Sequence, residues 1–60
     1  MTSKTNYFAA AKNAARNARK SGLCQSAQHR IAIEVIAAAL PNKSAELWQD
    51  LGWQAVLAAQ

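Results

Sequence analysis

Two residues with chemically reactive side chains lie close together in the sequence, Cys24 and His29. A thiolate activated by an imidazole is a nucleophile, but such a pair needs a cleft and a third group that orients the base. The same side chains bind zinc, which takes four protein ligands in a structural site and three in a catalytic one. Two such ligands are too few for either site. We expect Cys24 to be a small buried residue at a helix connection, and His29 to lie at a helix edge or on the surface.

The carboxylates are equally uninformative about catalysis. Glu34, Glu46 and Asp50 have no spacing that suggests a paired acid and base, and the chain has no glycine-rich phosphate loop. We therefore expect a non-enzymatic protein with no catalytic, cofactor-binding or metal-binding residues and no small-molecule substrate.

Charge is distributed unevenly along the chain. Residues 1–30 contain no acid and six basic residues: Lys4, Lys12, Arg16, Arg19, Lys20 and Arg30. Residues 31–60 contain Lys43 and all three acids. Such an asymmetry indicates an acidic partner for the basic half.

The sequence predicts one small all-α domain, 1–60, made of three short helices at about 5–20, 26–40 and 43–59. Glycine and proline interrupt the chain at Ser21-Gly22 and Leu40-Pro41. Gly22 suits the left-handed position that ends a helix, and proline disfavours helical geometry in the residue before it. The first two helices should form an antiparallel hairpin. Ser26 is the expected N-cap of the second helix, and Asn42 or Ser44 that of the third.

Apolar spacing predicts which side of each helix is buried. The first helix has a shallow apolar arc formed by Tyr7, Phe8, Ala11, Ala14, Ala15 and Ala18. In the second helix, only the strip carrying Arg30 and Glu34 is clearly polar, which is typical of a helix enclosed on almost every side over residues 31–40. The third helix has an expected inner face of Leu47, Trp48, Leu51, Ala55 and Ala58.

The stretch ARKSGLCQSAQHRI, residues 18–31, resembles the helix-turn-helix of Cro-type phage repressors. Ala18, Gly22 and Leu23 match the alanine, turn glycine and apolar residue of that motif, and Ile31 matches a buried position of its recognition helix. The resemblance implies a DNA-binding regulator in which residues near the turn contact bases and phosphates. Together with the basic row of the first helix, the candidate nucleic-acid contacts are Lys12, Arg16, Arg19, Lys20, Gln25, Gln28, His29 and Arg30.

Two residues depart from the helix-turn-helix pattern. Ser21 and Gln28 are polar where the family usually has apolar residues. An ordinary connection between two helices, with a glycine stop, explains the same residues, and we favour this interpretation.

A second candidate surface lies on the third helix. Trp53, Val56 and Leu57 fall outside its expected inner face and would form an exposed apolar patch, which is typical of a protein interface. A chain of this size has a small core, so a homodimer is expected. The apolar face of the first helix is too shallow for membrane binding.

These observations favour a small regulatory protein that binds another protein, itself, or both. In size, charge and alanine-rich helices the chain is similar to accessory proteins encoded in the early regions of lambdoid phages and prophages. The lone cysteine suits a reducing compartment, so we expect a location in the cytoplasm, which would be the host cytoplasm for a phage protein.

Overall fold

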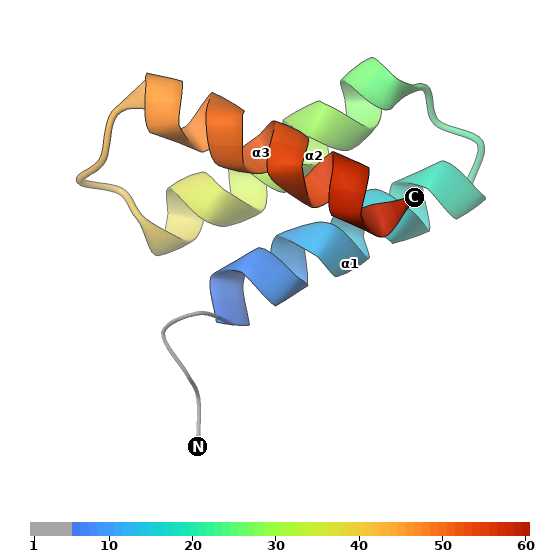
Figure 1. Cartoon of the computed structure of the whole chain (residues 1–60), viewed down its shortest axis with the longest axis horizontal. Helices are drawn as coiled ribbons and strands as arrows, with labels where there is room; N and C mark the ends of the chain where they lie inside the picture. The colour runs from blue at the N-terminus through green and yellow to red at the C-terminus, as the bar shows by residue number, and fades with distance from the viewer. Residues whose placement is uncertain (1–5) are drawn as a thin grey trace.

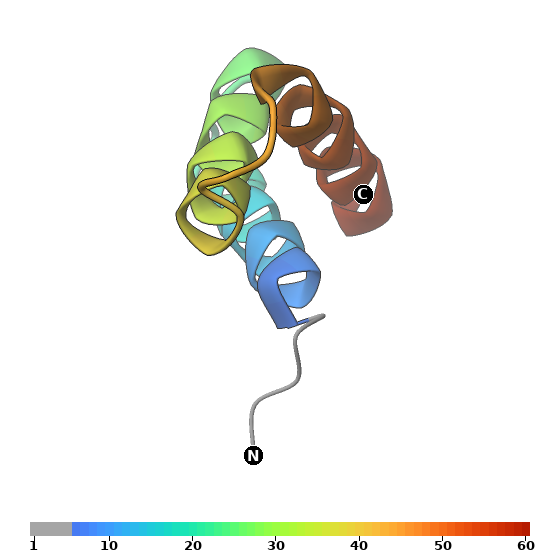
Figure 2. The ribbon, with the colours of Figure 1, turned by 90° about the vertical axis from the view of Figure 1, so that its left-hand side faces the viewer.

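The computed structural model describes residues 6–60, which form three α-helices: α1 (Asn6–Lys20), α2 (Gln25–Ala39) and α3 (Ala45–Ala59). The predicted all-α fold is confirmed, and each helix end lies within two residues of its predicted position. α1 and α2 run in opposite directions as the predicted hairpin, and α3 returns in the direction of α1 (Figure 1). Every pair of helices is in contact, as the side view in Figure 2 shows. None of the three helices has the length and apolar content needed to span a bilayer.

Gly22 ends α1 as predicted. Its φ of +88° lies in the left-handed region, which glycine adopts without steric cost. The Leu23 amide donates to the Ala18 carbonyl (3.0 Å), and the Gly22 amide donates to the Arg19 carbonyl (3.0 Å). This pair of bonds is a Schellman motif, which satisfies carbonyls that a helix end leaves unpaired.

The other helix ends are held by different contacts. Ser44 is the N-cap of α3, where its hydroxyl oxygen accepts a hydrogen bond from the Leu47 amide (3.3 Å). The prediction of Ser26 as the N-cap of α2 is wrong. Cys24 holds that position with extended backbone angles and no side-chain bond, and Ser26 lies inside the first turn.

The core consists mostly of alanine. α1 contributes three buried residues from its predicted arc, Ala11, Ala15 and Ala18, with Tyr7 and Phe8 half-buried beside the core. Among the described residues, the largest fully buried side chains are Ile36 and Val56. Methyl groups allow helices to approach closely, but each buries little apolar area. The three helices therefore pack tightly around a small core.

α2 is less enclosed than its sequence predicted. Its buried residues are Gln28, Ala32 and Ile36, whereas Ala38 and Ala39 are exposed. The predicted enclosure of residues 31–40 on almost every side is therefore wrong. Two neighbouring helices cover two sides of α2 and leave its outer side in solvent. The predicted polar strip lies on that outer side, since Arg30 and Glu34 are exposed.

α3 is rotated about its axis relative to the prediction. Its buried residues are Gly52, Ala55, Val56 and Ala59. Of the expected inner face, Ala55 is buried and Trp48 and Leu51 are half-buried, but Leu47 and Ala58 are exposed. Trp48 is held at the edge of the core because its indole Nε1–H donates to the Leu40 carbonyl at the end of α2 (2.8 Å).

The rotation of α3 follows from a close approach to α2 at Gly52. A Cβ built on Gly52 would lie 2.8 Å from Ile33 Cγ1 and 3.0 Å from His29 Cδ2. Carbon atoms at van der Waals contact are about 3.5–4.0 Å apart. The side chains of α2 thus occupy the space that any other residue at position 52 would need.

We predict that Gly52→Ala lowers the free energy of unfolding by about 1 kcal/mol. Overpacking costs about 1–3 kcal/mol, and the higher helix propensity of alanine offsets up to about 1 kcal/mol of that loss. Urea denaturation followed by circular dichroism measures the change. In an Ile33→Ala background, where the nearest atom is removed, the same substitution should cost less. A stabilising effect of Gly52→Ala alone would contradict the close approach.

Candidate interaction surface

The two reactive residues of the sequence, Cys24 and His29, lie in different surroundings in the structure. Residues 6–60 contain no group of three or more Cys, His, Asp or Glu side chains that could hold a metal ion. Cys24 is a free, exposed thiol, so its predicted burial is wrong. The N-cap position places it outside the packed part of α2, where neither neighbouring helix covers it.

His29 is part of the contact between α2 and α3. Its Nε2 lies 2.9 Å from the Gln49 carbonyl oxygen. A carbonyl only accepts, so Nε2 carries the proton and donates. The imidazole stacks on the indole of Trp53, with ring centroids 3.9 Å apart and planes 13° from parallel. The half-buried position agrees with the helix-edge location predicted for this residue.

The predicted apolar patch on α3 divides into two surface residues and one core residue. Trp53 is 42% exposed and Leu57 is 64% exposed. Val56 is fully buried in the core, so its assignment to the interface is wrong. Gly52 and Val56 are four residues apart and share one side of α3. The approach of α2 at Gly52 therefore also covers Val56.

Trp53 and Leu57 lie in a row with two acids along the exposed side of α3. Glu46, Asp50, Trp53 and Leu57 are spaced four, three and four residues apart, which places them on one helix face. All four side chains are exposed, and we call them the outer row. The Gln54 amide donates to Asp50 Oδ2 (3.2 Å) and helps to orient that carboxylate. The outer row combines two large apolar groups with two negative charges.

The structure separates the candidate nucleic-acid contacts into accessible and inaccessible residues. Exposed members are Arg16, Arg19, Lys20, Gln25 and Arg30, and Lys12 is half-buried. Gln28 is only 6% exposed, and its Nε2 donates to the Leu23 carbonyl (3.0 Å). Its assignment as a nucleic-acid contact is therefore wrong. The polar end of its side chain is satisfied within the fold. The Nε2 atom of His29 is also occupied, because it donates to the Gln49 carbonyl of α3.

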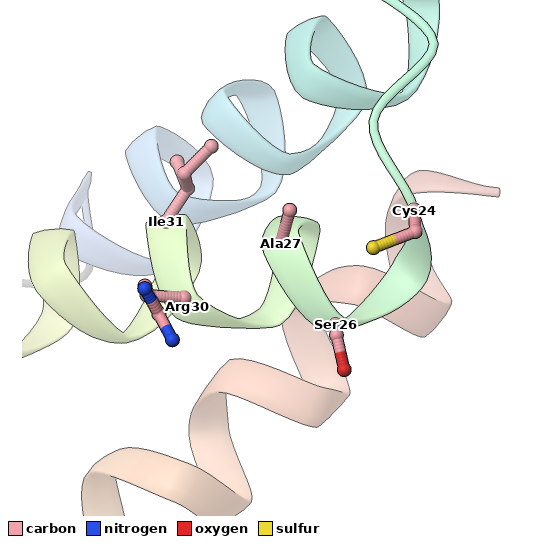
Figure 3. A pocket seen from close by; sticks show the side chains of 5 residues that line it. All are labelled: Cys24, Ser26, Ala27, Arg30 and Ile31. Atoms are coloured by element: carbon pink, nitrogen blue, oxygen red, sulfur yellow. The ribbon is translucent and has the colours of Figure 1, made fainter.

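A shallow hollow of about 400 Å³ lies on α2 and is lined by Cys24, Ser26, Ala27, Arg30 and Ile31. Ala27 and Ile31 point towards α1, whereas Ser26 and Arg30 point away from it (Figure 3). The polar groups of the lining are the Cys24 thiol, the Ser26 hydroxyl and the Arg30 guanidinium. Such a lining offers no general base to activate a nucleophile.

Sequence reasoning missed two exposed leucines, Leu23 at 44% and Leu47 at 36%. Leu23 follows the Schellman turn, which carries it beyond the end of α1. Leu47 was expected in the core and is exposed by the rotation of α3.

No model of a known protein family, no curated protein and no solved structure matches the chain.

We predict that Gln28→Met lowers the free energy of unfolding by about 1 kcal/mol. Methionine keeps most of the buried volume but cannot donate to the Leu23 carbonyl, and one such bond contributes about 0.5–1.5 kcal/mol. Urea denaturation measures the change. Gln25→Met is the matched control, because Gln25 is exposed and its substitution should leave stability unchanged. Equal effects of the two substitutions would contradict the structural role of Gln28.

Proposed function

We propose that this chain is a small non-enzymatic regulatory protein that acts by binding a protein partner through the outer row of α3. The observation that carries the proposal is the exposure of Trp53 and Leu57 on one face, beside a core made mostly of alanine. Leaving these side chains in water costs hydrophobic free energy that contact with a partner would recover. Tryptophan is also enriched among residues that dominate binding energy.

Three further observations support a binding role for the outer row. The His29 stack restricts the Trp53 ring, so less side-chain entropy is lost when a partner binds. The two acids give the row a charge pattern that selects among partners. The resemblance to phage accessory proteins suggests a host or phage protein as the partner, and the lone cysteine suits the cytoplasm as its location.

The proposal predicts that Leu57→Ser weakens partner binding by about 2 kcal/mol, the typical effect of removing a dominant interface residue. Affinity capture from a lysate of the source cells would compare three baits: wild type, Leu57→Ser and Ala58→Ser. Ala58 is the matched control because it is exposed and lies outside the outer row. A captured protein should be retained by the wild type and Ala58→Ser but lost from Leu57→Ser. Identical capture by all three baits would argue against the outer row. Circular dichroism should show unchanged helicity for both variants.

A second candidate function is DNA binding, as the helix-turn-helix resemblance implies. The observation that favours it is the exposure of Arg16, Arg19 and Lys20 at the end of α1, close in sequence to the exposed Gln25 and Arg30 of α2. Exposed cations of this kind contact phosphates and provide the salt-dependent part of DNA affinity. This candidate is weaker than the first because Gln28 is buried and His29 is half-buried, so fewer side chains can reach bases.

If DNA binding is the function, the logarithm of the association constant for duplex DNA should fall linearly with the logarithm of the salt concentration. The expected slope is about −3.6, the value for about four phosphate contacts. The double variant Arg16→Ala and Arg19→Ala should reduce this slope to about −1.8. Fluorescence anisotropy of a labelled duplex measures both slopes. The absence of binding at about 50 mM salt, where phosphate contacts contribute strongly, would rule out this candidate.

A further inference from the structure

We propose that the outer row of α3 binds the basic side of α1 in a second copy of this chain. The inference rests on the proposed function, because it names the partner of the same surface. We define the basic row of α1 as Lys12, Arg16 and Lys20, which are spaced four residues apart and share one helix face.

The charges of the two rows are complementary. α1 has three cations in the basic row, with Arg19 beside them, and contains no acid. α3 has Glu46 and Asp50 and contains no basic residue. Contact between two α1 helices or between two α3 helices would place like charges together, which disfavours both arrangements. Contact between α1 of one copy and α3 of the other pairs opposite charges.

The spacing of the charges fits this pairing. Arg16 and Lys20 are four residues apart, as are Glu46 and Asp50, which corresponds to about 6 Å along each helix axis. Within one copy α1 and α3 run in the same direction (Figure 1). A two-fold axis perpendicular to the helices would reverse the second copy, so that α3 meets the partner copy's α1 in an antiparallel arrangement.

In the antiparallel arrangement Glu46 meets Lys20 and Asp50 meets Arg16. Trp53 and Leu57 then face Lys12 and the exposed Ala9. One face of the Trp53 ring is taken by His29, which leaves the opposite face for a cation such as Lys12. The two-fold symmetry forms every contact twice, as in most homodimers.

The small core gives a second argument for self-association. Only Ile36 and Val56 are large and fully buried among the described residues, whereas Trp53 remains 42% exposed and Leu57 64% exposed. Pairing two copies would bury four large side chains from the two outer rows. Oligomerisation is a common means by which small helical domains gain the burial that a single core lacks.

The test is charge reversal measured by sedimentation equilibrium of the pure protein in low salt. The first variant carries Glu46→Lys and Asp50→Lys, and the second carries Arg16→Glu and Lys20→Glu. The wild type should dimerise, and each variant should have a dimer dissociation constant raised by about tenfold or more, because attraction becomes repulsion. An equimolar mixture of the two variants should dimerise again, because the reversed α3 of the first variant attracts the reversed α1 of the second, and the two remaining native rows pair as in the wild type.

Two single substitutions on the outer side of α2 serve as matched controls. Glu34→Lys and Arg30→Glu reverse exposed charges outside both rows and should leave the dissociation constant unchanged. Circular dichroism of every variant checks that the helices remain folded. A variant that unfolds is replaced by its neutral form, Gln for the acids or Ala for the bases, which should weaken dimerisation in the same direction.

Three results would overturn the inference: a wild type that stays monomeric at about 1 mM, equal effects of the row and control reversals, and a mixture that does not dimerise. A monomeric wild type whose Leu57 is still required for capture of another protein would overturn only this inference and would leave the proposed function standing. A dimer that shows the expected effects of charge reversal, and that is also weakened by Leu57→Ser, would identify the second copy as the partner.

Discussion

The structure depends on the close approach of α2 to α3 at Gly52. Because this residue has no Cβ, Ile33 and His29 lie directly against the α3 backbone. Any larger residue would push the helices apart and open voids beside the small side chains of the core. In a core made mostly of alanine, the spacing of the helices determines how many contacts the methyl groups make.

The same approach determines which residues of α3 face solvent. With Gly52 turned towards α2, Val56 enters the core and the outer row faces away from it. The stack of His29 on Trp53 then covers part of the indole and holds it at the edge of the contact. The binding surface that we propose is therefore a consequence of helix packing. Its residues are exposed because their neighbours on the helix are buried.

Two polar side chains near the turn between α1 and α2, Gln28 and His29, have structural roles in this fold. His29 links α2 to α3, and Gln28 links α2 to the turn that follows α1 through the Leu23 carbonyl. Sequence reasoning listed both as candidate nucleic-acid contacts because the resemblance to a helix-turn-helix places such residues near bases and phosphates. It could not identify their partners, since the Gln49 carbonyl and the Trp53 ring are brought to His29 only by tertiary packing.

The sequence by itself determined the three helices, the glycine stop, the buried arc of α1 and the polar strip of α2. These features depend on contacts within a few residues, such as the Schellman bonds around Gly22. The tertiary structure alone decided the rotation of α3, the burial of Val56 and Gln28, and the exposure of Cys24. The reason is that alanine is tolerated both in cores and on surfaces. An alanine-rich helix therefore has several nearly equivalent apolar faces, and packing against its neighbours selects one of them.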